Sequence, residues 1–490
     1  MNNEQFEQLR SEGYNRIPVY RSVLADLDTP LSVYLKLAAG KDSYLLESVE
    51  GGETWGRYSI IGLPCQRRYT VRGRQLIISD NGIQVDEETV ADPLARIAEL
   101  QSQFNVPRID ELPLFSGGLV GYFGYETVHL IEPKLANVEK RDDLGTADIE
   151  LLLSEEVAVL DNLQGRLWLI VHADAGQPGA FIRAQKRLDE LEHQLRTASP
   201  RYGLRVQGDA IREKDFSYGF ERDDFVAAVE KSKEYILAGD IFQVVLSQRM
   251  SVPYEARPLD VYRSLRALNP SPYMYFIDLG ETQIVGSSPE VLVRVQNRRL
   301  TLRPIAGTRH RGRNAEEDQA LAKELLTDPK ECAEHLMLID LGRNDAGRVA
   351  LTGSVEMTDQ MVIERYSHVM HIVSEVQATL DDGLCAMDAI RASFPAGTLS
   401  GAPKFRAMEI IDEFEPVKRN IYAGAVGYIS WHDDTDLAIA IRTAVIHEGK
   451  LHVQAGAGIV ADSNAEKEWQ ETRDKGRALI TAVDRASRGL

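Results

Sequence analysis

The chain has 490 residues, of which 43% are hydrophobic and 27% are charged. Those proportions are typical of globular proteins, and the length exceeds what one hydrophobic core ordinarily supports, so we expect two domains. The formal net charge of −19 argues against a general nucleic-acid-binding protein, because such proteins present a basic surface.

The sequence shows no signal for export, membrane insertion or disulfide bonding. No apolar run reaches the roughly 20 residues of a membrane-spanning helix, and the polar N-terminus lacks the basic region and apolar run of a secretory signal. The three cysteines, Cys65, Cys332 and Cys385, form no CxxC pair and predict no disulfide scaffold. We therefore expect a cytoplasmic protein that binds neither membranes nor nucleic acid.

The first part of the chain, to about residue 170, is rich in short β-type runs. Strands are expected at 43–48, 57–63 and 67–73, and 74–86 predicts a hairpin that turns at Asp80-Asn81-Gly82, because Asn-Gly tolerates positive φ. The glycine-rich segment 117–126 is not followed by a GxxxxGK[ST] motif. Its glycines therefore predict close backbone packing rather than phosphate binding.

A helical run at about 178–197, followed by a polar stretch, marks a boundary within 176–215. We expect an N-terminal domain over 1–175 and a second domain over 215–490. The second part predicts the following elements in order: helix 221–240, strand 241–250, hairpin 291–312, helices 315–327 and 330–342, strands 422–431, 437–447 and 450–463, and helix 464–487. Strands and helices come in blocks, which favours an α+β fold. We expect large, mostly antiparallel sheets packed as a sandwich with helices outside, in two lobes.

Two predicted helices each carry a pair of glutamates three positions apart, Glu331 with Glu334 and Glu468 with Glu471. That spacing places each pair on one helix face, about 5–6 Å apart at Cβ. Carboxylate oxygens suit a hard cation such as Mg²⁺. A single pair is ordinarily a solvated face, and Lys475 would then be an ordinary salt-bridge partner of Glu471.

The last helix has a predicted N-cap at Ser463, with Glu466 as its capping-box partner. Capping fully explains Glu466, which is therefore no candidate for the metal site.

Other segments combine polar and small residues in ways that suit a ligand. The basic turn at 307–313 offers N–H groups and positive charge to a carboxylate, or is a basic surface loop. His371, in an apolar strand, is either a core residue or a general acid. Arg442 interrupts an apolar run and is costly to bury unpaired, which favours a ligand or an ion pair. Gly456 and Gly458 would let a ligand approach the strand backbone.

Taken in order, these motifs resemble those of the chorismate-utilising enzymes, and most closely the family of anthranilate synthase large subunits (component I). The motifs are GDIFQVVLSQR, SSPE, RPIAGTRHRG, DPKECAEHLMLIDLGRND, SHVMHIVSEV, FPAGTLSGAPK, YAGAVGY, AIRT and QAGAGIVADSNAEKEWQETRDK. They run through residues 239–475, and the N-terminal part also resembles the first domain of the family.

The resemblance implies a magnesium site and a chorismate site. Glu334 and Glu471 would bind Mg²⁺ directly and Glu331 and Glu468 directly or through water, and the ion would hold the ring carboxylate of chorismate. His371 would be the acid near the departing ring hydroxyl, with Glu290 as a second proton-transfer group. The implied substrate contacts are Gly307, Thr308, Thr398, Tyr422, Arg442, Gly456, Ala457, Gly458 and Lys475.

Two positions separate the members of this family. Salicylate and isochorismate synthases typically have a lysine, which activates water, where this chain has Gln243. Many aminodeoxychorismate synthases have a lysine where this chain has Ala306. Both departures favour conversion of chorismate and ammonia to anthranilate and pyruvate, a step of tryptophan biosynthesis. The alternatives are an aminodeoxychorismate or isochorismate synthase, and a tryptophan-binding protein without activity.

The resemblance also implies an inhibitor and a partner. Ser48 together with Pro272, Tyr273 and Met274 resembles the tryptophan feedback site of the family, although each segment alone is no more than a strand end or a proline-rich turn. No cysteine lies in a glutaminase-type nucleophile turn. We therefore expect ammonia to come from a separate glutamine amidotransferase subunit, anthranilate synthase component II.

Overall fold

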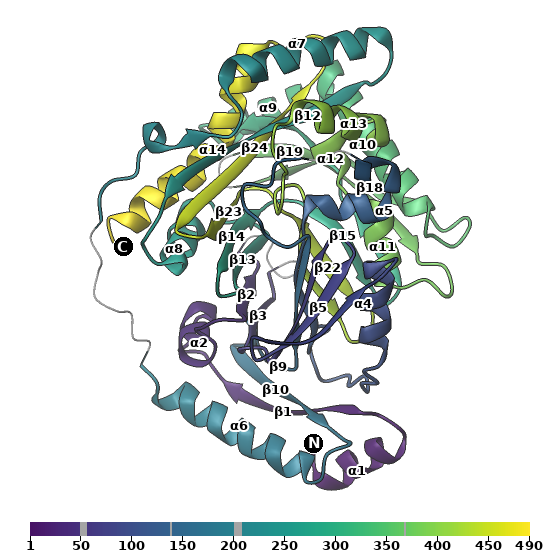
Figure 1. Ribbon diagram of the computed structural model, residues 1–490, viewed down its shortest axis with the longest axis vertical. Coiled ribbons are helices and arrows are strands. Elements are labelled where there is room, and N and C mark those ends of the chain that lie inside the picture. The colour runs from purple at the N-terminus through teal and green to yellow at the C-terminus, as the bar shows by residue number, and fades with distance from the viewer. Residues whose placement is uncertain (50–55, 138–139, 200–207, 367–368) are drawn as a thin grey trace.

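The computed structural model describes residues 1–49, 56–137, 140–199, 208–366 and 369–490, which form two 12-stranded sheets (Figure 1). The first sheet has β20 (Gly401–Ala402) paired with β12 off its main path. Its strands lie in the order β1 (Arg16–Leu24), β10 (Arg166–Asp174), β9 (Glu156–Asp161), β3 (Tyr58–Gly62), β2 (Ser43–Glu47), β13 (Tyr273–Asp278), β14 (Thr282–Ser288), β23 (Thr443–His447), β24 (Lys450–Ile459), β12 (Gln243–Pro253) and β11 (Ser217–Tyr218).

The second sheet has β18 (Glu356–Arg365) paired with β19 off its main path. Its strands lie in the order β17 (Ile305–His310), β19 (Val369–Thr379), β16 (Arg299–Leu302), β15 (Val291–Gln296), β22 (Thr435–Ile439), β21 (Ala425–Ser430), β7 (Gly118–Phe123), β8 (Ile149–Ser154), β4 (Arg67–Arg72), β5 (Gln75–Asp80) and β6 (Ile83–Thr89). The strands of each sheet pair antiparallel, as in β12–β24 and β7–β21.

The helices connect the strands and cover the sheets. They are α1 (Asn3–Ser11), α2 (Pro30–Leu37), α4 (Pro93–Ser102), α5 (Val128–Ile131), α6 (Ala180–Thr197), α7 (Arg222–Ala238), α8 (Pro258–Leu268), α9 (Ala315–Thr327), α10 (Pro329–Gly347), α11 (Ala386–Ser393), α12 (Gly397–Ser400), α13 (Lys404–Phe414) and α14 (Ala465–Ser487). Among the described residues, no helix combines the length and the apolar character needed to cross a bilayer.

The two sheets pack face to face, and helices cover their outer faces. Between the sheets, Tyr44 and Ile277 of the first sheet share one apolar cluster with Val120 and Ala438 of the second. Helices α2, α6, α8 and α14 contribute to the cluster on the outer face of the first sheet, and α4, α10, α11 and α13 contribute to a cluster that covers the second. In Figure 1, α6 lies beside β10 and α14 lies along β24. The predicted α+β sandwich with helices outside is confirmed.

Both sheets contain strands from both predicted domains. In the first sheet β2 pairs with β13, and Leu45 lies opposite Phe276. In the second sheet β7 pairs with β21, and Gly121 lies opposite Gly427. The two segments therefore share hydrogen-bonded sheets, and the division into 1–175 and 215–490 stays a prediction.

The hairpin of the first part forms as predicted, and the glycine-rich segment 117–126 has the close backbone packing that its glycines predict. Strands β5 and β6 turn at Asn81 and Gly82, whose φ angles are 50° and 77°. A Cβ on Gly121 would lie 2.0 Å from the carbonyl oxygen of Glu150 on β8. Only glycine permits that approach, so this segment is built for close backbone packing.

Three predicted details are wrong. The segment 307–313, predicted as a basic turn, begins as a strand, because β17 runs to His310 and pairs with β19. The run 437–447 is not one strand but two, β22 and β23, which belong to different sheets. The chain turns at Arg442, whose φ is 48°. The N-cap of α14 is Asn464, whose side chain accepts from the N–H of Lys467, while the Ser463 hydroxyl accepts from the N–H of Val460 instead.

Candidate functional site

One cavity of about 470 Å³ gathers the predicted catalytic, substrate and metal residues. Its walls come from β12 and β24 of the first sheet, β17 and β19 of the second, and helices α10, α12 and α14. The lining includes Gln243, Glu290, Gly307, Thr308, Glu331, Glu334, His371, Thr398, Tyr422, Arg442, Gly456, Gly458, Glu468, Glu471 and Lys475. Segments that are more than 200 positions apart in the sequence therefore meet in one place.

The two glutamate pairs face this cavity from the N-terminal turns of α10 and α14. Burial raises the pKa of Glu334, and the charge of Glu331 raises it further. Burial likewise raises the pKa of Glu468, and Glu471 adds to the effect. The two carboxylates of each pair therefore repel each other, although Arg309 forms an ion pair with Glu331 at 3.0 Å and Lys475 forms one with Glu471.

This donor chemistry fits a hard divalent cation, which would relieve the repulsion within each pair. Within the described ranges, no three His, Cys, Asp or Glu side chains converge closely enough to form a metal site on their own. A bound Mg²⁺ characteristically keeps several waters and takes few protein carboxylates. The pairs therefore fit an ion whose remaining ligands are water and substrate oxygens.

Gln243 lies against one carboxylate of the glutamate pairs, that of Glu334. Its Nε2 donates to Oε1 of Glu334 at 3.2 Å, and a Cβ on Gly458 would lie 2.5 Å from the same nitrogen. Gly458 therefore leaves the room that the Gln243 amide occupies. A glutamine held in this way cannot act as a base, because its amide does not ionise.

His371 lies on β19 with one ring nitrogen fixed. Its Nδ1 is 3.0 Å from the carbonyl oxygen of Gly307 and 3.1 Å from Oγ1 of Thr308. The carbonyl can only accept, so Nδ1–H donates to it and Nε2 is the nitrogen left for chemistry in the cavity. Burial lowers the pKa of His371, and the Tyr366 ring lies edge-on to the imidazole, 5.6 Å between centroids.

Glu290 and Thr398 form a second polar contact in the cavity. Thr398 Oγ1 donates to Oε2 of Glu290 at 3.1 Å. Burial raises the pKa of Glu290, which favours a form that can carry a proton at a higher pH than an exposed glutamate. The pair suits a proton-transfer role.

Cationic groups line the cavity together with the carboxylates. Arg442 is placed there by the turn between β22 and β23, and its charge acts on Glu290 and His371. Lys475 Nζ is 2.8 Å from Glu471 Oε1 and donates to the carbonyl oxygen of Gly456 at 2.9 Å. The cavity thus combines acidic pairs, which suit a cation, with cationic side chains, which suit a carboxylate.

One predicted substrate residue does not line the cavity. The side chain of Ala457 is fully buried in the apolar core, as the alternation of β24 requires when Gly456 and Gly458 face the other side. Its assignment stays a prediction. Lys330 and Gln454 line the cavity and were missed, although Gln454 shares the alternation of the two glycines.

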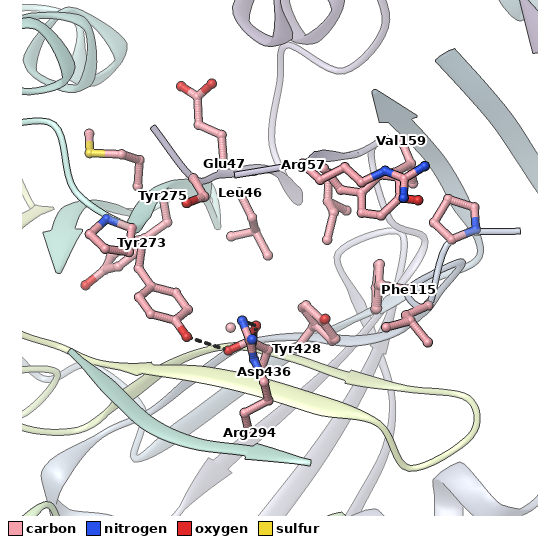
Figure 2. A pocket seen from close by; sticks show the side chains of 18 of the residues that line it. Leu46, Glu47, Arg57, Phe115, Val159, Tyr273, Tyr275, Arg294, Tyr428 and Asp436 are labelled. Carbon is pink, nitrogen blue, oxygen red and sulfur yellow. Dashed lines mark hydrogen bonds and ion pairs between the residues drawn. The ribbon is translucent and has the colours of Figure 1, made fainter. Parts of the chain in front are cut away.

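A second cavity, of about 250 Å³, lies between the sheets (Figure 2). It is lined by all four predicted inhibitor residues: Ser48, Pro272, Tyr273 and Met274. Figure 2 shows Leu46 and Glu47 on one side and Tyr428, Asp436 and Arg294 on the other. Tyr273 donates to Asp436 at 2.8 Å, and Arg294 forms an ion pair with the same carboxylate at 2.6 Å.

Other residues that line the second cavity were not predicted from the sequence. Missed lining residues include Glu47, Arg57, Phe115, Arg294, Tyr428 and Asp436. Glu47 directly precedes Ser48, whereas the others come from strands and loops that are distant in the chain, and no motif connects them.

Comparisons with known proteins show the family to which the chain belongs. A sequence model of the family described as chorismate binding enzyme matches residues 48–481. The chain is 57% identical to anthranilate synthase component 1 of Pseudomonas aeruginosa, over 100% of both chains. It is 53% identical to the protein of that name in Neisseria meningitidis serogroup B, over 99% of both.

Solved structures show the same fold. Anthranilate synthase component I from Streptococcus pneumoniae superposes with a TM-score of 0.78 and 38% identity, covering 94% of this chain and 99% of that one. The menaquinone-specific isochorismate synthase from Escherichia coli, at 19% identity over 98% of both chains, has a TM-score of 0.70 and shows the fold alone. The chain belongs to the chorismate binding enzyme family, and within it to the group named anthranilate synthase component 1.

Proposed function

We propose that the chain converts chorismate and ammonia to anthranilate and pyruvate, as the large subunit of an anthranilate synthase. The observation that carries this proposal is the hydrogen bond from Gln243 to Glu334, a member of one glutamate pair. The side chain of Gln243 is not a base. A lysine in place of Gln243 would activate water as the nucleophile. The amide of Gln243 cannot do so, which favours ammonia as the nucleophile. The sequences named anthranilate synthase component 1 support the same reaction.

The chain's glutamates would hold Mg²⁺, with Glu334 and Glu471 as direct ligands and Glu331 and Glu468 direct or through water. When bound, the ion neutralises the ring carboxylate of chorismate and withdraws electrons from the ring. Arg442, with support from the hydroxyl of Tyr422 and the open backbone at Gly456 and Gly458, would bind the carboxylate of the enolpyruvyl arm.

Two side chains, those of His371 and Glu290, would transfer protons. Ammonia forms a bond to the ring carbon next to the carboxylate-bearing one, and the ring hydroxyl leaves as water with a proton from Nε2 of His371. Glu290 would serve the second proton transfer, as pyruvate is eliminated and the ring becomes aromatic. Gly307, Thr308, Thr398 and Lys475 would contact the ring and its carboxylate.

Product analysis tests this proposal directly. With chorismate, Mg²⁺ and ammonium, we expect a fluorescent product with the mass of anthranilate, together with pyruvate. Aminodeoxychorismate or isochorismate, which differ from anthranilate in mass, would instead support the other enzymes of the family. Folded protein that binds tryptophan and leaves chorismate unchanged would support the binding protein without activity.

The partner would be a glutamine amidotransferase subunit. Burial raises the pKa of the thiols of Cys65 and Cys385, so neither is a ready thiolate. Cys332 Sγ lies 3.3 Å from the carbonyl oxygen of Leu326, at the start of α10. We expect the protein to act in the cytoplasm. Without the partner subunit, the isolated chain should use ammonium salts but not glutamine.

The second cavity would be the tryptophan feedback site. Ser48→Phe should raise the tryptophan concentration for half-inhibition at least about tenfold, equivalent to ~1.4 kcal/mol, because a phenyl ring would occupy space that the ligand needs. Turnover without tryptophan should stay close to that of the unsubstituted chain, which is the control. Inhibition curves at fixed chorismate measure the effect. Unchanged inhibition would place the site elsewhere.

A further inference from the structure

The larger cavity, which is proposed to bind chorismate, is called the chorismate cavity. A buried ion pair lies behind its wall and is not part of its lining. Arg419 and Glu415 are 2% and 3% exposed. The guanidinium donates to both carboxylate oxygens, from Nε at 2.8 Å and from one terminal nitrogen at 2.6 Å. Such a buried pair is weak evidence for stabilisation, because desolvation offsets most of its attraction. Its other bonds indicate a different role.

Two of the remaining N–H groups of the Arg419 guanidinium bond to two segments of the cavity wall. One donates to the carbonyl oxygen of Leu399 at 2.8 Å and another to that of Val245 at 2.7 Å. Leu399 follows Thr398, and Val245 lies two positions after Gln243 on β12. Leu399 and Val245 themselves line the cavity. The Arg419 guanidinium therefore holds the backbone next to both Thr398 and Gln243.

The same guanidinium also supports an aromatic wall. Its central carbon lies 5.6 Å from the centroid of the Tyr422 ring and 4.7 Å from that of Tyr125. The Tyr422 hydroxyl reaches within 2.8 Å of the place where a Cβ on Gly456 would stand. Displacement of the guanidinium would therefore free the Tyr422 ring to shift against β24.

Glu415 extends the network to a fourth part of the wall. It accepts from the backbone N–H of Ser247 at 2.8 Å and from its hydroxyl at 2.9 Å. Gln454, which lines the cavity, donates to that hydroxyl at 2.9 Å. The ion pair is thus bonded to α12, β12 and, through Ser247, to β24.

We propose that Arg419 is a positioning residue for chorismate, acting through Thr398, Gln243 and Tyr422. The proposal rests on the proposed function of the cavity. A lysine would keep the charge and the partner Glu415, but its single ammonium cannot reproduce a planar fork that reaches two carboxylate oxygens and two carbonyls at once.

Arg419→Lys tests the proposal, with kinetics at saturating ammonium. We expect the chorismate KM to rise about tenfold and kcat/KM to fall up to about 100-fold, because small displacements of binding groups have effects of that size. Circular dichroism should show folded protein.

Arg68→Lys is the matched control. Arg68 also bridges carboxylates and a carbonyl, with Glu150 at 3.0 Å and the oxygen of Leu279 at 2.9 Å, but it lies on β4 and lines neither cavity. We expect it to lower the melting temperature while the chorismate KM stays unchanged.

Two results would overturn the positioning role. One is an Arg419→Lys protein whose KM matches that of the unsubstituted chain while only its melting temperature falls. If that variant does not fold, Glu415→Gln replaces it, since the amide keeps the shape and loses one strong acceptor; an unchanged KM there has the same meaning. Failure of the unsubstituted chain to form anthranilate would instead contradict the proposed function, so the two failures are distinguishable.

Discussion

Glu334→Gln is expected to abolish anthranilate formation while the protein stays folded. If Glu334 is a direct magnesium ligand, its loss removes several kcal/mol of transition-state stabilisation, and ~4 kcal/mol corresponds to about a 1,000-fold lower kcat/KM. The fold should tolerate the change, because burial and Glu331 already raise the pKa of Glu334. A carboxylate whose charge is disfavoured in the folded state loses little when a neutral amide replaces it.

The companion substitution Glu471→Gln should have the same effect on activity. It also removes the ion pair with Lys475 at 2.8 Å, but both side chains are about half exposed, so that loss should be no more than ~0.5 kcal/mol of stability. Calorimetric titration with Mg²⁺ in the presence of chorismate should show weakened binding in both variants.

Glu466→Gln is the matched control, because Glu466 lies on the same helix as Glu471 and outside the cavity. It forms an exposed ion pair with Arg222 at 2.6 Å. We expect near-normal turnover. Near-normal turnover in Glu334→Gln or Glu471→Gln would contradict the metal assignment.

The elements that could be predicted from the sequence are those that local patterns specify. Helix α14 carries an apolar face from Trp469 to Val483, and the Asn81-Gly82 turn needs no distant partner. The break between β22 and β23 could not be predicted. The N–H of Ser287 donates to the carbonyl oxygen of Arg442, and the N–H of Ala423 donates to that of Ala440. These bonds to Ser287 of β14 and to Ala423 before β21 fix the turn. Arg442 interrupts the apolar run from 437 to 447, but a single charged residue does not distinguish a turn from a polar position within one strand.

The two cavities differ in how far the sequence could specify them. The chorismate cavity is lined by short motifs, each continuous in sequence, so the order of these motifs predicted most of its lining. The spacing of the four glutamates alone would have predicted solvated pairs. The second cavity depends on the pairing of β2 with β13 and of β21 with β22. Glu47 on β2 and Asp436 on β22 belong to different sheets, and the face-to-face packing of these sheets brings them to one cavity although 388 residues lie between them in the chain. No local pattern encodes such a distance.

His371→Asn is the second substitution with a large expected effect. Asparagine retains a donor for the Gly307 carbonyl, 3.0 Å from Nδ1 in the native protein, but it cannot carry a proton to the leaving hydroxyl. General acid catalysis ordinarily contributes about 10²–10⁴-fold. We therefore expect kcat to fall by that factor with a small change in the chorismate KM. Thr308→Val removes the 3.1 Å contact to the imidazole and a proposed contact to the substrate, but leaves the imidazole as the acid. It should therefore affect the chorismate KM with a much smaller loss of kcat, and it is the variant for comparison.

The pH profile distinguishes this role from a merely structural one. Burial lowers the pKa of His371 below the usual value of about 6.5, so the free enzyme loses the imidazolium form as pH rises through that lowered pKa. Because kcat/KM reports the free enzyme, its alkaline decline should have a midpoint below about 6.5. Bound chorismate brings negative charge near the ring and stabilises the imidazolium, so the decline in kcat should lie at higher pH than the decline in kcat/KM. His371→Asn should flatten both declines. Declines that persist unchanged in that variant would assign the proton transfer to another group, and Glu290, whose pKa burial raises, would be the next to substitute.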